Sequence, residues 1–403
     1  MPDFGGAELD GFRAEAREWL EANFPASLRG RVDSDALDPT GDAALWKQRV
    51  GVRGWGTPTW PKAYGGGGLS RAEARVLGEE MSRIGASNPI GGMGVIMFGP
   101  TLLEYGNEDQ KQRHFPPIVR GELRWCQGFS EPGAGSDLAS LQTKAVDMGD
   151  HYLVNGSKIW TSGAHYADWC FCLVRTDTTK KHEGISFLLI DMRSPGVEAR
   201  PILLMNGTTP FCETFFTDVK VPKANLMGPL NGGWTIAKRL LQHEREGISG
   251  ANTGGGAPPP GSLMGPPLTE LAPTYVGLDE TGRLADADLR TRLTKHLMED
   301  RAFQLTGQRA AAESRSNSGP SAVSSVLKNV GSQVRQERAE LAVEILGHQG
   351  LGWTGEAYGA DELAATRVWL RGKSGTIAGG SQEVQYNIIS KRILGLPDTT
   401  QNG

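Results

Sequence analysis

The sequence contains few cysteines, no long apolar run and no excess of positive charge. Four cysteines among 403 residues are far too few for a scaffold held together by disulfides. No run of about eighteen apolar residues occurs that would span a bilayer, and the acidic start of the chain lacks the features of a signal peptide. A net charge of −4 leaves no basic footprint for nucleic acid or an anionic membrane. We therefore expect a soluble, cytoplasmic protein whose partners are small molecules or other proteins.

Two kinds of ligand signature are also missing. The four cysteines are Cys126, Cys170, Cys172 and Cys212. No pair of histidines completes a zinc-like set with them, so we interpret them as small packed apolar residues and predict no metal site. No predicted strand is followed by Gly-x-Gly-x-x-Gly, so the usual dinucleotide-binding turn is absent as well.

The residue pattern changes twice along the chain. Residues 12–24 and 72–84 carry helical periodicity with few β-branched residues. The middle of the chain is β-rich, and its strand-like segments are separated by Asn-Gly, Asp and Ser-Pro turns. These segments are 151–160, 169–176 and 184–192. Helical patterns return from Trp234 onward.

This order predicts an α+β fold of three parts. We place an N-terminal α-helical domain at 1–124, a middle antiparallel β domain at 125–230 and a C-terminal, four-helix-bundle-like domain at 231–403. Residues 249–273 are too rich in Gly and Pro to continue a helix, so we predict a loop there. Such a loop is either a solvent-exposed linker or a lid over a pocket.

Two segments of the middle part carry the strongest functional signal. The first, WCQGFSEPGAGSD at 125–137, is followed by GSKIWTSGAHYADW at 156–169. Gly133 and Gly135 permit a tight turn that approaches a ligand, although PGAGS taken alone favours an ordinary hairpin turn. Hydroxyl groups suited to polar ligand oxygens lie in and beside the first segment, at Ser130, Ser136 and Thr143.

Both segments resemble the acyl-CoA dehydrogenase family in order and spacing. The same holds for TPTWPKAYGGGGLS at 57–70, ETFFTDVKVPKANLMG at 213–228 and GTIAGGSQEVQYNIISKRILGLP at 375–397. The resemblance implies that family's fold, an FAD cofactor, an acyl-CoA substrate and an electron-transfer flavoprotein as electron acceptor. It also implies a homodimer or homotetramer, with a hetero-oligomer as the alternative.

The resemblance assigns roles to individual residues. It places Trp160 and Ser162 beside the flavin ring, Phe129 and Ser130 at its pyrimidine end, and Ser136 on the CoA side. It further implies that the adenine half is held across a subunit contact by Glu344, Gly347 and Gln382. The family's Arg-x-x-Phe-Gly flavin segment is missing here, and Gly380 replaces a common Thr, so cofactor contacts in the third part are expected to differ.

The catalytic base is expected at an unusual position. Many relatives carry a Glu in the closing signature, but this sequence has Ala378 at that point, and alanine cannot accept a proton. A branch of the family that acts on branched-chain and sterol-derived thioesters carries the Glu on the helix after the β domain, before an Arg. Glu244 and Arg245 match that pair, so Glu244 is the predicted base and Arg245 a substrate contact. The backbone amide of Ala378 is retained for polarising the thioester carbonyl.

Helical periodicity supports Glu244 independently. Glu244 shares a stripe with Ile236, Ala237, Leu240, Leu241 and Ile248. Glu246 lies about 200° away, on a side that is expected to meet solvent. That side also carries Arg239, Gln242 and His243. Without the resemblance, a structural ion pair would be the better interpretation of Glu244.

The sequence thus favours an FAD-dependent acyl-CoA dehydrogenase that removes an α-proton and a β-hydride to form a 2,3-enoyl-CoA. The acyl group is expected to be branched, cyclic or otherwise bulky, as in fatty acid or sterol side-chain β-oxidation. Two alternatives stay open. One is a flavin monooxygenase or oxidase on the same fold, and the other is a catalytically silent subunit of a hetero-oligomeric dehydrogenase.

Overall fold

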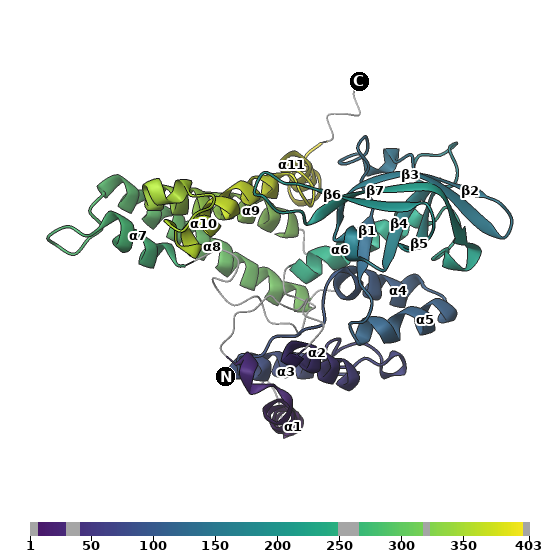
Figure 1. The fold of residues 1–403 in the computed structure, drawn as a ribbon, viewed down its shortest axis with the longest axis horizontal. Helices are drawn as coiled ribbons and strands as arrows, with labels where there is room; N and C mark the ends of the chain where they lie inside the picture. The colour runs from purple at the N-terminus through teal and green to yellow at the C-terminus, as the bar shows by residue number, and fades with distance from the viewer. Residues whose placement is uncertain (1–6, 30–40, 249–265, 317–322, 398–403) are drawn as a thin grey trace. The chain divides into compact units, whose positions relative to one another are not determined.

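A computed structural model describes residues 7–29, 41–248, 266–316 and 323–397, without the side chains of 7–8, 244–248 and 311–316 (Figure 1). The chain divides into two compact units. The first contains Met1–Ile202 and Pro210–Ala257, and the second contains Leu203–Thr209 and Pro258–Gly403. No helix within the described ranges is both long enough and apolar enough to cross a membrane.

The first unit begins with a group of helices. They are α1 (Ala7–Asn23), α2 (Gly41–Arg53), α3 (Arg71–Arg83), α4 (Gly99–Tyr105) and α5 (Glu108–Val119). α1 and α3 confirm the two helices predicted from periodicity. α3 begins with a capping box, in which the Ser70 side chain accepts a hydrogen bond from the Glu73 amide and the Glu73 carboxylate accepts one from the Ser70 amide. Apolar faces of α1, α2 and α3 form one core with Leu20, Trp46 and Leu77.

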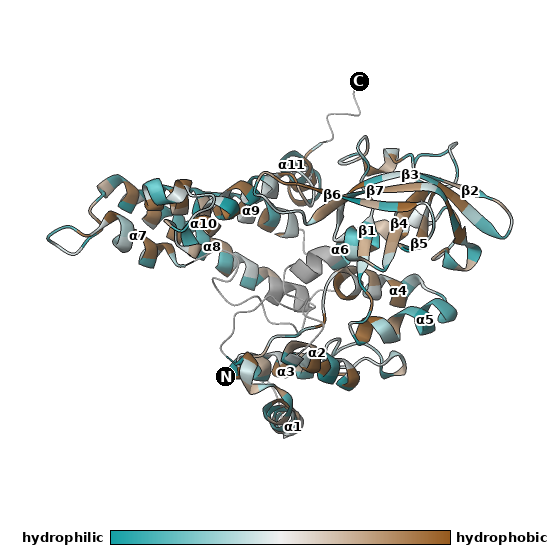
Figure 2. Cartoon of the chain, viewed as in Figure 1, coloured by the Kyte–Doolittle hydropathy of each residue, from teal (hydrophilic) through white to brown (hydrophobic). Residues whose placement is uncertain are grey.

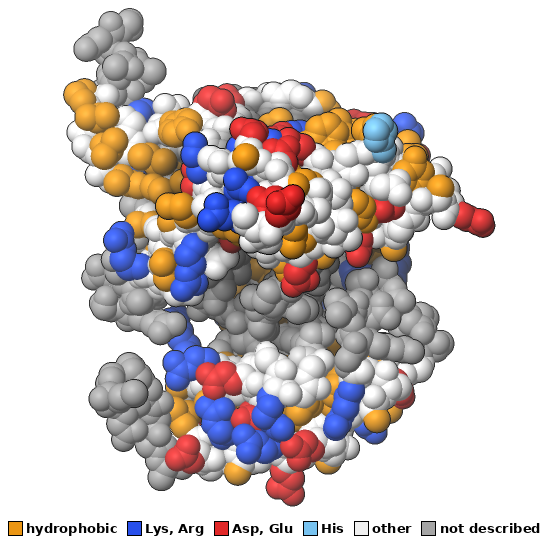
Figure 3. Space-filling view, turned by 90° about the vertical axis from the view of Figure 1, so that its left-hand side faces the viewer, with side chains coloured by type: hydrophobic (Ala, Val, Ile, Leu, Met, Phe, Trp, Pro, Cys, Tyr) orange, Lys and Arg blue, Asp and Glu red, His pale blue; other side chains and the backbone are white. Residues whose placement is uncertain are grey.

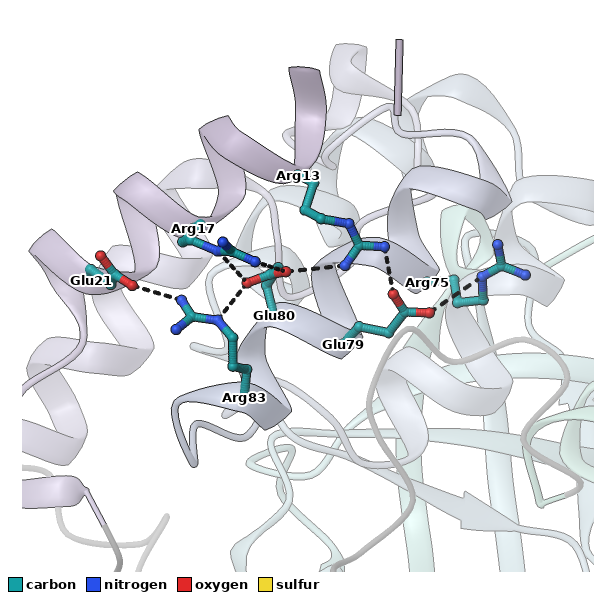
Figure 4. A network of polar contacts seen from close by, with 7 residues as sticks. All are labelled: Arg13, Arg17, Glu21, Arg75, Glu79, Glu80 and Arg83. Atoms are coloured by element: carbon teal, nitrogen blue, oxygen red, sulfur yellow. Dashed lines mark hydrogen bonds and ion pairs between the residues drawn. The ribbon is translucent and has the colours of Figure 1, made fainter. Parts of the chain in front are cut away.

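A charged network joins α1 to α3 around the buried Glu80 (Figure 4). The Glu80 carboxylate accepts hydrogen bonds from Arg17 and Arg13 at 3.0 Å and from Arg83 Nε at 2.7 Å. Arg17, and after it Arg83 and Arg13, lower the pKa of Glu80 to about 2 although burial opposes the shift. The carboxylate therefore stays ionised, and stabilises the fold, over the whole neutral range.

Replacing this carboxylate should remove a pH-dependent part of the stability. We expect Glu80→Gln to lower the free energy of unfolding by about 2 kcal/mol at pH 7, since the arginines are partly solvated and the full pKa shift overstates the loss. Because the pKa is depressed in the folded state, the difference is present above the ordinary value of 4.5 and disappears as the pH falls toward 2. Urea unfolding of both proteins between pH 7 and pH 2 measures it.

Glu79→Gln is the matched control, because Glu79 pairs with Arg13 on the exposed side of the same network. It should cost less than about 1 kcal/mol. A difference between wild type and Glu80→Gln that stays constant down to pH 2 would contradict this account of Glu80.

The middle of the first unit is a seven-stranded sheet. Its strands are β1 (Trp125–Gly128), β2 (Lys144–Asp147), β3 (His151–Ser162), β4 (Trp169–Arg175), β5 (Ile185–Asp191), β6 (Val197–Ile202) and β7 (Phe211–Pro222). The order is β1-β4-β2-β3-β7-β6, and β5 pairs with β4. β4 and β5 are almost wholly buried and are largely brown in Figure 2.

The predicted sheet is confirmed, but its strands are not all antiparallel. β1 runs parallel to β4, and β2 meets β4 in parallel at Lys144 and Arg175. The other four pairings are antiparallel. Parallel pairing arises because the long loop after β1 and the β2–β3 hairpin separate β1 from β4 in the chain, so the two strands meet without a direct hairpin connection.

One Asn-Gly pair is not a turn. Asn155 and Gly156 lie inside β3, where the register with β7 shifts between Val154 and Gly156. Gly156 has φ +147°, and a Cβ there would lie 2.7 Å from the Cα of Thr143. The glycine therefore provides a bulge that lets β3 pass close to the start of β2. By contrast, Asn206 and Gly207 do lie in a turn, in which the Gly207 amide donates to the Leu204 carbonyl at 2.9 Å.

The second unit is helical. Its helices are α7 (Leu268–Val276), α8 (Ala287–Ser316), α9 (Val323–Leu346), α10 (Ala360–Gly372) and α11 (Gln382–Ile388), and α7, α8 and α9 share an apolar core. The loop predicted over 249–273 is wrong at its end, because α7 begins at Leu268. Residues 268–272 contain neither Gly nor Pro and place Leu268, Leu271 and Ala272 in that core. Residues 249–265 lie outside the described residues.

Shorter helical turns connect these elements. The 3-10 turns are Ala26–Leu28, Lys62–Tyr64, Leu138–Ser140, Ala164–Tyr166, Lys223–Asn225, Gly347–Leu351 and Lys373–Thr376, and the π-helical turns are Gly94–Phe98 and Ile389–Ile393. On the face drawn in Figure 3, Lys and Arg side chains lie interspersed with Asp and Glu side chains. Among the described residues on that face, the basic side chains form no continuous stripe of the kind that binds nucleic acid.

Candidate functional site

The site starts at the loop that follows β1. The Lys158 side chain is fully buried, and its Nζ donates to Glu131 Oε1 at 2.8 Å and to the Phe129 carbonyl at 3.0 Å. One residue further along β3, the Ile159 amide donates to the Ser130 carbonyl at 2.8 Å. These bonds hold the beginning of the loop against the C-terminal end of β3.

Three of the predicted flavin residues meet at this place. Ser130 is fixed beside Ile159, Trp160 is the next residue on β3, and Ser162 ends that strand opposite Phe211. Trp160 has φ +61°, a left-handed conformation that is rare for a residue with a Cβ, and its side chain is 53% exposed. Its ring touches Phe211 edge to face at 6.0 Å between centroids. The segment therefore presents an open aromatic surface flanked by serines.

The other two predicted residues of the first motif differ in exposure. The Phe129 ring is buried and packs edge to face on Phe171 and Phe187, while Ser136 is exposed at the tip of the loop. Thr143 is buried and its hydroxyl donates to the Ser157 carbonyl at 3.3 Å, so this hydroxyl already has a partner within the chain. The Thr143 amide instead faces the Glu131 carboxylate.

Neither the backbone conformation nor the packing of the loop requires glycine at its two glycine positions. Neither Gly133 nor Gly135 has positive φ, and a Cβ at either position would meet nothing within 4 Å. The loop does contain a tight turn, since Glu131 and Ala134 exchange backbone hydrogen bonds at 3.0 Å. The ordinary tight turn that this stretch favours by its composition is therefore present at 131–134.

Helix α6 (Gly233–Ile248) carries the predicted base. Its buried stripe includes Ile236, Ala237 and Leu240, as the periodicity indicates, and packs on β4, β5 and α4. The helix runs through Glu244 and Arg245, whose side chains lie outside the described residues. Glu244 follows Leu240 by four residues and Ala237 by seven, so its helical position is in line with theirs.

The side of α6 that was expected to meet solvent packs against α4 instead. His243 is buried, and its Nε2 lies 3.1 Å from Glu104 Oε1. Arg239 donates to the same carboxylate at 2.7 Å, and this hydrogen bond, with the charges of Arg239 and His243, lowers the pKa of Glu104 against the effect of burial. The expectation is wrong for His243, because a polar helix position is also buried when a carboxylate of another helix lies opposite it, whereas the Glu246 side chain lies outside the described residues.

The closing segment lies in the second unit. The Ala378 amide donates to the Ser374 carbonyl at 2.9 Å. It is therefore already engaged, and an oxyanion role would require it to leave that carbonyl or share its hydrogen. The Gln382 side-chain Nε2 is buried and has no hydrogen-bond partner among the described residues.

Two further predicted cofactor residues lie at the C-terminal end of α9, one within the helix and one just after it. Glu344 forms an ion pair with Arg292 of α8, with 2.7 Å between Arg292 Nη1 and Glu344 Oε2, so its carboxylate has a partner within the chain. Gly347 has φ +56° and follows the last residue of α9. This is the usual glycine position at a helix C-terminus.

The sequence analysis did not identify several charged residues that organise the site. Lys158 and Glu131 are the buried ion pair of the loop. Arg175 at the end of β4 donates to the carbonyls of Ala139 and Leu141 and so orders the far end of that loop. For Arg175 the signal available in the sequence was a cation at the end of an otherwise apolar strand, which requires a buried partner, whereas β3 is half polar and gave no such signal for Lys158.

The four cysteines are buried and free, as expected. Within the described ranges, no group of three or more His, Cys, Asp or Glu side chains could hold a metal ion. Burial raises the pKa of Cys212, which lies 3.1 Å from His165 Nδ1, and disfavours a reactive thiolate.

Comparisons with known proteins agree across the chain. Three family models match it, and they are the N-terminal, middle and C-terminal domains of acyl-CoA dehydrogenase at residues 6–122, 126–219 and 275–394. The chain is 35% identical to "Acyl-CoA dehydrogenase IpdE1" of Mycobacterium tuberculosis over 97% of this chain and 98% of that protein.

Two solved structures share the fold over almost their whole length. "Tcur3481-Tcur3483 steroid ACAD" has a TM-score of 0.73 at 30% identity and covers 98% of this chain and 99% of that chain. The ChsE4-ChsE5 complex from Mycobacterium tuberculosis has a TM-score of 0.72 at 30% identity and covers 99% of this chain and 100% of that chain. Since the family models match well over half of the sequence and a relative above 30% identity spans nearly all of it, the chain belongs to the acyl-CoA dehydrogenase family and is an oxidoreductase.

Proposed function

We propose that this protein is an FAD-dependent acyl-CoA dehydrogenase that forms a 2,3-enoyl-CoA from a bulky acyl-CoA. The main observation behind this proposal is that Ser130, Trp160 and Ser162 lie together at the C-terminal end of β3. The backbone of Trp160 is left-handed there, its indole ring is exposed, and a serine lies on either side of it. An unfavourable backbone conformation of this kind is typical of functional sites.

Residues of the first unit fit the flavin part of an FAD cofactor. Trp160 offers an open aromatic face, and Ser130 and Ser162 offer hydroxyls beside it. In the second unit, Gln382 has a buried amide nitrogen without a partner, and both side-chain polar atoms of Asn329 are buried and unpartnered among the described residues. Buried donors and acceptors of this kind fit a polar ligand. When bound, the flavin supplies the acceptor for the hydride from the β carbon.

Glu244 is the residue that we propose to remove the α-proton. Its helical position continues the buried stripe of α6, where a carboxylate is kept from bulk water and is a better base than an exposed one. Arg245 is proposed as a substrate contact, and Ser136, exposed at the loop tip, as a contact to the CoA part. The division into domains at 125 and 231 also stays a prediction.

The bulky substrate and the partners rest on the comparisons. One solved relative is named as a steroid acyl-CoA dehydrogenase and another as a complex of two different chains. We infer that this chain accepts a steroid-derived or comparably branched acyl group and forms an oligomer, either of one chain or of two. An electron-transfer flavoprotein is the proposed electron acceptor.

A second candidate is a catalytically silent subunit of a hetero-oligomeric dehydrogenase. It is favoured by two engaged groups, because the Ala378 amide donates to Ser374 and the Glu344 carboxylate pairs with Arg292. Both groups would have to change partners before they could act on a substrate or a cofactor.

One experiment separates the candidates. The purified protein is mixed anaerobically with straight-chain, branched and steroid-side-chain CoA thioesters while the visible absorption of the oxidised flavin is followed. We expect bleaching by the branched or steroid thioesters, since transfer of the β-hydride reduces the flavin. A flavin that stays oxidised with every thioester argues for oxygen-using chemistry, and a colourless protein argues for the silent subunit.

A further inference from the structure

We propose that the buried ion pair of Lys158 and Glu131 positions the loop 129–143 and the left-handed Trp160, and thereby shapes the flavin side of the site. This inference rests on the proposed function in one respect, namely that the surface formed by Ser130, Trp160 and Ser162 receives a flavin. The positioning itself is a property of the chain and is testable without cofactor. Neither residue belongs to the predicted set of site residues.

Lys158 connects two parts of the chain that are far apart in sequence. Its ammonium group is wholly removed from solvent and reaches both the Glu131 carboxylate and the Phe129 carbonyl. A buried ion pair is weak as a source of stability, because the desolvation of two charges offsets their attraction. What such a pair does provide is a defined geometry, since only one arrangement satisfies both charges.

Glu131 extends this geometry to the far end of the loop. Its Oε2 accepts a hydrogen bond from the Gln142 amide at 2.6 Å, and its Oε1 accepts one from the Thr143 amide at 2.9 Å. The Glu131 carboxylate, near the start of the loop, thus bonds its last two residues and leaves the tip, with Ser136, exposed. Burial raises the pKa of Glu131, but the Lys158 charge and these hydrogen bonds lower it overall, so the carboxylate is ionised.

The same cation sets the path of β3 toward Trp160. Lys158 is anchored inward, the Ile159 amide is tied to the Ser130 carbonyl, and the register with β7 shifts between Lys158 and Thr161. Trp160 lies within that shift at φ +61°. This backbone conformation is unfavourable for a residue with a Cβ, so neighbouring residues must impose it. The anchored Lys158 and the bonded Ile159 are the neighbours that do so.

The test separates positioning from stability with three variants. Lys158→Met removes the charge and leaves Glu131 buried without its cation, so it is expected to lower the melting temperature strongly. The double variant Lys158→Met/Glu131→Gln keeps the volume and removes both charges, and it should recover most of that melting temperature. Glu80→Gln is the control for global destabilisation, because Glu80 lies in the network of α1 and α3.

The diagnostic readout is hydrogen exchange at the Ile159 amide in the cofactor-free protein. Neither substitution in the double variant removes a group to which this amide bonds, because its acceptor is the Ser130 carbonyl. We expect exchange at Ile159 to be at least about tenfold faster in the double variant than in Glu80→Gln, and the dissociation constant for FAD to rise at least about tenfold.

Equal exchange at Ile159 in the double variant and in the control would overturn the proposal, because the ion pair would then be merely structural. The proposed function fails separately. If the wild-type protein binds no FAD, the flavin surface is refuted, whereas faster exchange at Ile159 in the double variant would still establish the positioning role of the pair.

Discussion

Glu244→Gln is expected to bind FAD like the wild type and to slow the reduction of the flavin by acyl-CoA by about a thousandfold. Glutamine has nearly the shape of glutamate but cannot accept the α-proton, and general base catalysis contributes roughly 10²- to 10⁴-fold to a rate. FAD binding should be unaffected because Glu244 is proposed to act on the substrate and not on the cofactor. Anaerobic stopped-flow mixing with a thioester that bleaches the wild-type flavin measures the loss.

The matched control lies on the same helix. Glu246 is two residues further along α6, about 200° around the helix axis. Glu246→Gln changes charge and shape in the same way and should leave flavin reduction within about twofold of the wild type, since its helical position does not continue the buried stripe. Equal losses in the two variants would move the base away from Glu244 and attribute the effect to the charge of the helix end.

Gly156→Ala is expected to lower the free energy of unfolding by about 3 kcal/mol and to weaken the retention of FAD. Gly156 has a backbone conformation that side chains rarely adopt, and a Cβ would lie 2.6 Å from Thr143 Oγ1 and 2.7 Å from Thr143 Cα. The second contact is with backbone, so a rotation of the threonine side chain cannot relieve it. The loop end at Thr143 must move, and with it the amide that bonds Glu131.

Gly149→Ala separates the clash from the backbone conformation. Gly149 also has positive φ, at +96°, but a Cβ there would meet nothing within 4 Å. It should lose only about 1 kcal/mol, which is the cost of the left-handed conformation alone. Urea unfolding at pH 7 compares the two variants. If both lose the same amount, the close approach of β3 to Thr143 has no energetic consequence.

Local patterns in the sequence predicted several elements of the fold. Helical periodicity predicted α1 and α3, and β-branched runs predicted β3, β4 and β5, because the face that an element buries repeats along its own residues. The same reasoning placed the buried stripe of α6 correctly at Ile236, Ala237 and Leu240. Local patterns failed where one residue pair is compatible with two structures. The Asn155–Gly156 pair provides a bulge in β3 instead of a turn.

The candidate site was predictable only as a set of motifs. The resemblance brought Ser130, Trp160 and Ser162 into one hypothesis, and backbone pairing does bring them to the same end of β3. The Ala378 amide and the Glu344 carboxylate were also predicted, but their bonds to Ser374 and Arg292 were not. A motif specifies which residue types occur and says nothing about the competing partners that the fold supplies.

The sequence by itself determined the family and the order of helical and β parts, and it supplied the candidate residues for the proposed chemistry, because periodicity and motifs are local properties of the chain. Only the tertiary structure decided that Lys158 and Glu131 are buried together, that His243 faces Glu104, and that Trp160 is left-handed. Each of these outcomes depends on a partner or a register that comes from a distant segment. A charge is buried only where the fold brings a matching group to it, and the spacing of residues along one element does not contain that information.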